Sequence, residues 1–238
     1  MDLTVPILSV NSLTKKYNRF TALDGVTFTL PKGRIVGLLG PNGSGKTTLL
    51  KLCAGLLSPN GGSIAICGEA VGPKSKALVS YLPDRTYLSN RQTVKKQLDM
   101  FEDFYEDFDR QRAENMLRML NIHPSARFGT LSKGNKEKVQ LVLVMSRRAK
   151  LYLLDEPIGG VDPAARDYIL NTIITNYDPE ATVLISTHLI SDVESVLDDY
   201  LFLHNGRIIR GGMVDTERES SGKSLDELFR EVFSCLES

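Results

Sequence analysis

The stretch Gly40-Pro-Asn-Gly-Ser-Gly-Lys-Thr47 decides the fold, because it fits the phosphate-binding loop pattern G-x4-G-K-[ST] in full. Its glycines let successive backbone N–H groups turn inward around phosphate oxygens, and a helix starting at Gly45 adds its positive end. The apolar run Arg34–Leu39 precedes the loop, and a helical segment to about Leu56 follows it. This strand–loop–helix order is the one that the motif requires, so we expect a nucleoside triphosphate to bind here.

Individual loop residues have separate expected tasks. Lys46 is expected to reach the β- and γ-phosphates, Thr47 a magnesium ion, and Thr48 another phosphate. The expected nucleotide contacts are Gly40, Pro41, Asn42, Gly43, Ser44, Gly45, Lys46, Thr47 and Thr48. The alternative is a glycine-rich turn with an idle lysine, which the flanking strand and helix argue against.

A second chemical element lies at Leu151–Leu154, an apolar strand that ends in Asp155 and Glu156. A carboxylate at the end of such a strand is delivered to the magnesium side of the phosphate loop. The adjacent Glu156 points elsewhere, where it can orient an attacking water as general base. Strand ends are often acidic, so this pair gains its meaning from the phosphate loop.

The remaining segments alternate between strand and helix patterns. Strands are predicted at Ile7–Leu13, Thr21–Leu30, Gly62–Cys67, Leu78–Leu82, Thr182–Ser186, Tyr200–Leu203 and Arg207–Arg210, with Lys15–Phe20 as a polar connection. Helices are predicted at Thr93–Leu120, Asn135–Arg148, Pro163–Asn176, Leu189–Val196 and Ser224–Leu236. The first two strands read as antiparallel, and the later alternation predicts an α/β core with a parallel sheet.

The block Thr93–Leu120 carries aromatic residues at three- and four-residue steps. Phe101, Phe104, Tyr105 and Phe108 recur with this period, and acidic residues alternate with them. We expect an amphipathic helix whose aromatic face is buried and whose acidic face is solvated.

Composition narrows the class of protein. The 238 residues are 42% hydrophobic and 24% charged, which excludes disordered, collagen-like and coiled-coil chains. Three cysteines form neither a disulfide framework nor a metal-ligand spacing, which favours a reducing compartment. No apolar run approaches the roughly 20 residues that span a bilayer, and the first ten residues lack a signal-peptide pattern. We therefore expect a cytosolic protein.

Charge is balanced overall but unevenly distributed. The net charge of zero gives no sign of bulk nucleic-acid affinity. The first 100 residues hold thirteen Lys and Arg against five Asp and Glu, a formal charge of +8, and the rest of the chain carries −8. A basic half suits an anionic ligand, and an uneven solvated surface is an equally good interpretation.

The order of the motifs resembles the ATP-binding-cassette ATPases, the nucleotide-binding subunits of ABC transporters, over about residues 7–215. Leu131-Ser-Lys-Gly-Asn135 stands where that family has its signature loop, commonly Leu-Ser-Gly-Gly-Gln. Gly159-Gly-Val-Asp162 resembles the loop that crosses the family's dimer interface. Tyr17 resembles the aromatic residue that stacks on adenine, and His188 the histidine that contacts the γ-phosphate.

The resemblance implies a fold and a domain organisation. The fold is α/β, a P-loop NTPase core with a mixed or parallel sheet, an N-terminal antiparallel β-subdomain and an inserted α-helical subdomain. One nucleotide-binding domain is expected over residues 1–238, with the helical subdomain at about 85–150 and a helical tail at about 213–238.

The resemblance also implies partners. Two subunits, identical or related, are expected to face each other head to tail around two ATP molecules. Ser132 and Gly134 of one subunit would cover the ATP on the phosphate loop of the other, with Asp162 in the interface loop. A separate transmembrane permease subunit is the second expected partner, contacted by residues of about 84–110. The chain is then expected in the cytoplasm, peripheral on the inner face of the cell membrane.

The resemblance assigns chemistry as well. The expected activity is hydrolysis of ATP, with Mg²⁺ as cofactor and Lys46, Glu156 and His188 as the catalytic residues. Thr47, Asp155 and Asp84 are the expected metal-side residues.

Two departures from the family pattern stand out. The signature loop has Lys133 and Asn135 where glycine and glutamine are common, and it keeps the serine and the glycine. Asp84, in Tyr81-Leu-Pro-Asp84, stands where the family usually has a glutamine that senses the membrane partner. We expect Asp84 to act on the metal side, directly or through water, and the alternative is an acid that has drifted to the surface.

A rival from another class is a cassette ATPase that acts on nucleic acid or ribosomes. Such relatives usually have paired cassettes, long coiled-coil insertions or basic extensions, and this sequence has none of them, so no nucleic-acid partner is expected. A regulatory module that binds nucleotide without hydrolysis is a third option, which Asp155, Glu156 and His188 argue against. A generic P-loop kinase or GTPase leaves Tyr17 and the 131–135 loop without explanation.

Overall fold

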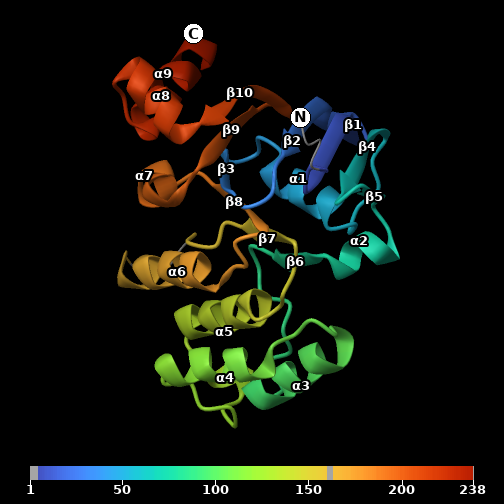
Figure 1. Ribbon diagram of the computed structural model, residues 1–238, viewed down its shortest axis with the longest axis vertical. Helices are drawn as coiled ribbons and strands as arrows, with labels where there is room; N and C mark the ends of the chain where they lie inside the picture. Colours follow the sequence, from blue (N-terminus) through green and yellow to red (C-terminus); the bar gives the residue numbers. More distant parts are fainter. Residues whose placement is uncertain (1–4, 160–162, 238) are drawn as a thin grey trace.

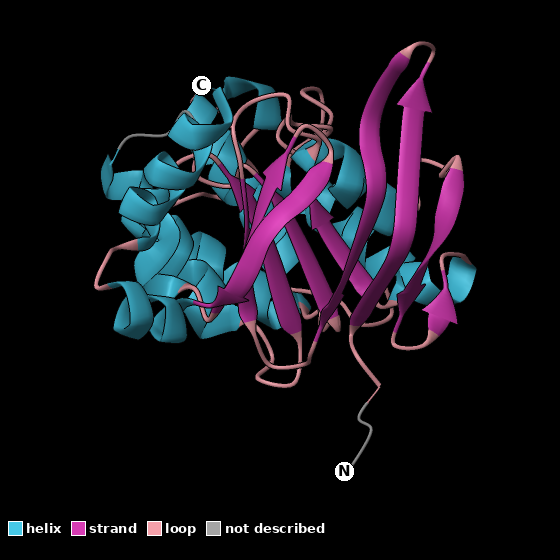
Figure 2. Cartoon of the chain, turned by 90° about the horizontal axis from the view of Figure 1, so that it is seen from above, coloured by secondary structure: helices cyan, strands magenta, loops and turns pink. Residues whose placement is uncertain are grey.

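The computed structural model describes residues 5–159 and 163–237, and this part of the chain forms two sheets with helices around them (Figures 1 and 2). The larger sheet has six strands in the order β10-β9-β3-β8-β7-β6. They are β3 (Ile35–Leu39), β6 (Val79–Leu82), β7 (Leu151–Asp155), β8 (Thr182–Thr187), β9 (Asp199–His204) and β10 (Arg207–Met213). Neighbours are parallel except for β9 and β10, so the predicted mixed α/β sheet is confirmed.

The central strands are buried on both faces. Along β7, Tyr152 and Leu154 pack into the core on the helical side, while Leu151 and Leu153 pack into the core beneath the smaller sheet. Side chains alternate between the two faces of a strand, so a strand with two covered faces needs apolar residues at every position. This requirement accounts for the continuous apolar runs in the sequence.

The smaller sheet is antiparallel, in the order β2-β1-β4-β5. Its strands are β1 (Leu8–Tyr17), β2 (Phe20–Leu30), β4 (Gly61–Ile66) and β5 (Glu69–Ala70). The prediction of a polar connection over Lys15–Phe20 was wrong, because Tyr17 pairs with Phe20 and the strands continue to a tight turn. Asn18 in that turn has a φ of 53°, a conformation that asparagine tolerates better than most residues.

Helices cover the larger sheet on its two sides. Six α-helices of the described chain lie outside the segment between β6 and β7. They are α1 (Lys46–Cys53), α2 (Pro73–Ala77), α6 (Pro163–Asn176), α7 (Ile190–Val193), α8 (Val214–Ser221) and α9 (Leu225–Glu237). In Figure 1, α1 lies beside the antiparallel sheet, and α6 lies on the side of the helical block. Among the described helices, none is long and apolar enough to cross a membrane.

The helical block between β6 and β7 has three helices, α3 (Val94–Phe104), α4 (Arg110–Met119) and α5 (Lys133–Met145). The prediction of one continuous helical block over Thr93–Leu120 was therefore wrong. The chain leaves the helix at Tyr105, whose backbone is extended, and Asp109 caps the next helix by accepting a hydrogen bond from the Arg112 amide. Phe104, expected on the buried face, is 77% exposed. The segment between α3 and α4 bonds to Arg147 and Arg148 through Asp107 and Asp109, and it is not helical although the sequence has a helical period.

Candidate functional site

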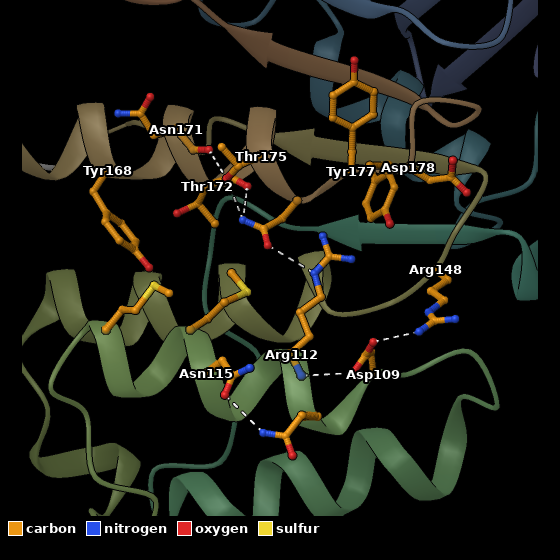
Figure 3. Close-up of a pocket in the computed structure, with 15 residues that line it drawn as sticks. Asp109, Arg112, Asn115, Arg148, Tyr168, Asn171, Thr172, Thr175, Tyr177 and Asp178 are labelled. Carbon is orange, nitrogen blue, oxygen red and sulfur yellow. Dashed lines mark hydrogen bonds and ion pairs between the residues drawn. The ribbon is translucent and has the colours of Figure 1, made fainter.

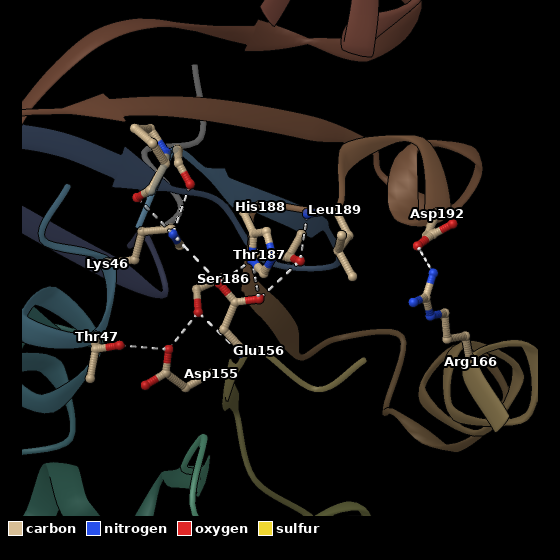
Figure 4. Close-up of polar contacts among 12 residues, drawn as sticks. Lys46, Thr47, Asp155, Glu156, Arg166, Ser186, Thr187, His188, Leu189 and Asp192 are labelled. Carbon is tan, nitrogen blue, oxygen red and sulfur yellow. Dashed lines mark hydrogen bonds and ion pairs between the residues drawn. The ribbon is translucent and has the colours of Figure 1, made fainter. Parts of the chain in front are cut away.

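The candidate site lies where the parallel strands β3, β7 and β8 end (Figure 4). The carboxyl ends of parallel strands meet at one edge of a sheet, which is where such folds place ligands. Asp155 is paired in register with Ser186, so residues 31 positions apart in the chain lie side by side. The phosphate loop follows β3 and leads into α1 at the same edge.

Two glycines of the loop occupy places that no other residue fits. A Cβ at Gly40 would lie 2.3 Å from the Leu203 carbonyl oxygen, and one at Gly45 would lie 2.6 Å from the Ala22 carbonyl oxygen. Gly45 also has a φ of 111° at the start of α1. The loop is therefore held tightly against the β9–β10 turn and β2, with its backbone free to face a ligand.

Lys46 is buried, and only 6% of its side chain is exposed. Its ammonium donates to the carbonyl oxygens of Gly40 at 2.7 Å and Pro41 at 3.2 Å, and lies 3.5 Å from Glu156 Oε1. Burial lowers the pKa of this lysine, and Glu156 opposes that shift. The cation is thus desolvated and held by neutral carbonyl oxygens of its own loop, which anionic phosphate oxygens can replace.

Asp155 has one satisfied oxygen and one free oxygen. Its Oδ1 accepts from Ser186 Oγ at 2.6 Å and from Thr47 Oγ1 at 3.1 Å. Its Oδ2 is buried without a hydrogen-bond partner among the described residues. Burial raises the pKa of Asp155, and the nearby Asp84 and Glu156 carboxylates add to the rise. An orphaned buried carboxylate oxygen is suited to a cation or to water bound to one.

Glu156 lies between two cationic or ionisable groups. Its carboxylate is 3.1 Å from His188 Nδ1, and Oε1 faces Lys46. Thr187 Oγ1 donates to Oε2 at 3.2 Å. The backbone of Glu156 has a φ of 50°, and its N–H donates to the Ser186 carbonyl. A left-handed conformation at a residue other than glycine is uncommon, and it turns this side chain away from the direction of Asp155.

Other predicted residues lie apart from this cluster. Ser132 is the N-cap of α5, and its Oγ accepts from the Asn135 amide at 3.3 Å. A Cβ at Gly134 would meet nothing within 4 Å. In Figure 1, the helical block that contains α5 is well separated from α1 and the phosphate loop. Tyr17, at the end of β1, is 43% exposed, with Lys15 Nζ 5.3 Å from its ring.

Of the two remaining predicted residues, the structure describes Asp84 but not Asp162. Asp84 is partly exposed, lies 3.9 Å from the Arg85 Nε, and is close enough to Asp155 to contribute to its raised pKa. Asp162 lies outside the described residues. The role predicted for each stays a prediction.

Three polar residues of the cluster were not singled out from the sequence. Ser186 and Thr187 end β8 and hold Asp155 and Glu156 in place. A polar pair at the end of an apolar parallel strand was the available signal. The third is Tyr81, whose buried hydroxyl has no hydrogen-bond partner in the described part of the chain. Burial, together with the nearby Asp155, raises the pKa of this phenol.

Comparisons with known proteins identify the family of the chain. Residues 23–159 match the family model described as ABC transporter. The chain is 32% identical to the ABC-type transporter ATP-binding protein EcsA of Bacillus subtilis, over 95% of this chain and 96% of that protein. It is 29% identical to the SkfA peptide export ATP-binding protein SkfE of the same organism, over 86% and 88% of the two chains.

A solved structure shows the same fold. The structure of an ATP-binding subunit of an ABC transporter superposes with a TM-score of 0.86 at 32% identity, covering 95% of this chain and 99% of that one. The family model, the sequence match over nearly the whole chain and the shared fold all indicate the same family. The chain belongs to the ABC transporter family, as an ATP-binding, ATP-hydrolysing subunit.

Proposed function

We propose that Glu156 is the general base for ATP hydrolysis and that this hydrolysis drives transport through a separate transmembrane permease. The observation that carries the proposal is the position of the Glu156 carboxylate, between Lys46 Nζ at 3.5 Å and His188 Nδ1 at 3.1 Å. A general base must lie close to the phosphate-binding groups to take a proton from an attacking water. Glu156 is placed there by its left-handed backbone.

Mg²⁺ fits the residues at this edge. Of the described residues, no group of three or more His, Cys, Asp or Glu is placed to hold a metal by itself. Magnesium at phosphate sites takes few protein ligands and completes its shell with phosphate oxygens and water. Thr47 Oγ1 and the free Asp155 Oδ2 would hold it, with Asp84 as a further metal-side residue. When bound, it would neutralise charge on the phosphates.

The chain's own residues do the rest. Backbone N–H groups of the Gly40–Thr48 loop, except at Pro41, which has none, bind the phosphates. Lys46 exchanges its carbonyl partners for phosphate oxygens. The Glu156 carboxylate accepts a proton from the water as the water oxygen bonds to the γ-phosphorus and the bond from that phosphorus to the bridging oxygen of ADP breaks. His188 holds the γ-phosphate in line, and Tyr17 stacks on the adenine.

A second subunit completes the site. Ser132 and Gly134 lie at the exposed start of α5, away from the phosphate loop of their own chain. We propose that they cover the ATP of a partner, identical or related, that faces this chain head to tail. The N-terminus of α5 would then point at the γ-phosphate, with ATP joining the two subunits.

A groove lined in part by Asp84 is the surface that we propose for contact with the permease. This groove has a volume of about 660 Å³, and Leu56, Tyr81, Tyr87 and Tyr105 are among the residues that line it. Tyr87 is 50% exposed and Leu56 is 59% exposed, large apolar surfaces that suit a protein partner. We propose that a cytosolic segment of the permease binds here, which places the chain on the inner face of the cell membrane.

Substitution Glu156→Gln tests the catalytic assignment. The ATPase rate is expected to fall by about 10²–10⁴-fold, the usual contribution of a general base, while ATP binding is retained. With ATP present, the variant is expected to elute as a dimer in size-exclusion chromatography. Glu180→Gln, at an exposed carboxylate, is the matched control. An unchanged rate in Glu156→Gln would reject Glu156 as the base.

The transport assignment needs a separate experiment. Tagged Glu156→Gln is purified with ATP from membranes of its native cells in mild detergent, and its companions are identified by mass spectrometry. A polytopic membrane protein in near-equal amount is the expected result. Recovery of ribosomes, nucleic acid or only soluble proteins would reject the transport assignment and leave the catalytic one standing.

A further inference from the structure

A cleft of about 980 Å³ lies between α4 and α6, away from the phosphate loop (Figure 3). Its walls come from α4 on one side, from α6 on the other, and from the chain around the start of β7. Arg112 reaches into it from α4 and Tyr168 from α6. Nothing in the ATPase mechanism uses this cleft.

Arg112 is a cation in the cleft whose guanidinium forms no direct ion pair with a carboxylate of the described residues. Its guanidinium is half-buried, and burial lowers its pKa. Among the residues that the structure describes, its one hydrogen-bond acceptor is the Asn176 side chain, with Nε donating to Oδ1 at 3.2 Å. An arginine has five N–H donors in a planar fork, so the two terminal amino groups are left for another acceptor.

The neighbouring carboxylates are already engaged elsewhere. Asp109 accepts from the Arg112 backbone amide through Oδ1 and from Arg148 through Oδ2, at 3.0 and 2.9 Å. Asp178 accepts from the Glu180 amide and lies 3.8 Å from Lys150. Asp109 is also within electrostatic reach of Arg112, so one carboxylate serves two guanidinium groups. In the described part of the chain, no carboxylate accepts a hydrogen bond from the Arg112 guanidinium.

The partner of Arg112 is held in a fixed orientation. Asn176 donates from Nδ2 to the Thr172 carbonyl oxygen and to Thr175 Oγ1, both at 2.9 Å. These two bonds direct its Oδ1 at Arg112 and keep the guanidinium in one orientation. The Arg112 fork is therefore preorganised, which lowers the entropy cost of binding a planar oxyanion.

The rest of the cleft offers apolar surface next to this charge. Met116 is buried, Met119 is 78% exposed, and both line the cleft with the ring of Tyr168. Lys138 lies 5.4 Å from that ring and adds a second positive charge nearby. Exposed methionine next to an aromatic ring adapts readily to apolar ligands.

We infer that the α4–α6 cleft binds a small oxyanion with an apolar body, whose carboxylate or phosphate pairs with Arg112 and whose body packs on Met116, Met119 and Tyr168. Arginine binds both oxyanions by the same two-pronged hydrogen bonding. Because α4 belongs to the helical block and α6 to the core, the bound ligand bridges the two parts of the domain. None of the residues that line the cleft belongs to the phosphate loop or to the Asp155–Glu156 pair.

Methionine methyl NMR tests this inference directly. The whole protein, nucleotide-free and labelled at its methionine methyl groups, is titrated with hexanoate, hexyl phosphate, inorganic phosphate and hexanol. We expect saturable shifts at Met116 and Met119 with the two hexyl anions, and no shift at Met213, which lies on β10. A local readout matters because inorganic phosphate also fits the phosphate loop. Tighter binding of hexyl phosphate assigns the ligand to phosphates, and tighter binding of hexanoate assigns it to carboxylates.

Variants on α4 decide the role of Arg112. Arg112→Gln is expected to weaken hexyl-anion binding by about tenfold or more, the scale of a lost charge-assisted pair, and Arg112→Lys by less. Arg118→Gln, on the same helix but outside the cleft, is expected to bind as the natural protein does. Equal affinity for hexanol and hexanoate, unchanged affinity in a folded Arg112→Gln, or no shift up to millimolar concentrations would each overturn the inference.

Discussion

Two cations, Lys46 and Arg147, are buried in the part of the chain that the structure describes, and their partners differ in kind. Lys46 at the nucleotide edge is 6% exposed, and Arg147 behind α5 is 3% exposed. Arg147 donates to both oxygens of Asp107, at 2.9 and 3.1 Å, and to the Ala77 and Val79 carbonyl oxygens. Its guanidinium also stacks on the Tyr105 ring, 3.9 Å from the centroid.

The partners explain the difference. Arg147 takes acceptors from α2, β6 and the break between α3 and α4, so its charge ties the helical block to the core. Lys46 takes two carbonyls from its own loop and faces Glu156 at 3.5 Å, so its charge can be transferred to a ligand. A buried charge with remote, fixed partners serves the fold, and a buried charge with local, exchangeable partners serves binding.

Removing Arg147 is expected to have the largest effect. Arg147→Ala leaves Asp107 and two carbonyl groups without their donor, and we expect the free energy of unfolding to fall by about 3–5 kcal/mol. Urea denaturation followed by circular dichroism measures this. Arg148→Ala is the control, since that side chain is 71% exposed with one ion pair, and its cost is expected below about 1 kcal/mol. Equal losses in the two variants would contradict the structural role of Arg147.

The next effect is on activity at Lys46. Lys46→Ala is expected to lower the ATPase rate by about 100-fold or more, as the loss of a preorganised phosphate contact does. The free energy of unfolding should stay nearly constant or rise, because a desolvated charge is removed. Lys32→Ala, at an exposed lysine, serves as the control for both measurements. A large loss of stability in Lys46→Ala would break the contrast with Arg147.

Two glycines, Gly129 and Gly134, also separate a position that serves the fold from one that serves binding. A Cβ at Gly129 would lie 2.6 Å from the Asn90 carbonyl oxygen, whereas one at Gly134 meets open space. Gly129→Ala is expected to cost about 1–3 kcal/mol of stability. Gly134→Ala is expected to leave the melting temperature unchanged and to lower the ATPase rate by about tenfold, because the partner's ATP must approach this position. An unchanged ATPase rate in Gly134→Ala would argue against the proposed dimer contact.

The smallest effect concerns Asp155. Burial raises its pKa in the nucleotide-free protein, so its ionised form is disfavoured in the folded state. This penalty is present in full above the folded-state pKa and disappears as the pH falls from the folded-state pKa to the unfolded-state value. Asp155→Asn should therefore raise the free energy of unfolding at pH 7, by about 1 kcal/mol, a typical point-mutation effect.

The measurement is urea unfolding of both proteins in EDTA at pH 7 and near pH 4. The gain in Asp155→Asn is expected at the first pH and is expected to shrink at the second. A gain that is the same at both pH values would show that Asp155 is not held in a disfavoured ionised form.

The sequence by itself determined the local elements of the site. The glycine positions of the phosphate loop, the apolar strand before Asp155 and the order of the motifs follow from local backbone requirements and from strand burial, which short stretches encode. The α/β class followed from the same alternation.

Only the tertiary structure decided which groups meet. Asp155 and Ser186, 31 residues apart, lie side by side because of the sheet register. Arg147 and Asp107, 40 residues apart, form an ion pair in the segment between α3 and α4. Helical periodicity over 93–120 carries no information about so distant a partner. The α4–α6 cleft likewise depends on which charges find partners across elements. Asp109 bonds to Arg148, and the Arg112 guanidinium has Asn176 as its one hydrogen-bond acceptor among the described residues. Long-range pairing is set by the whole fold, so no local pattern encodes it.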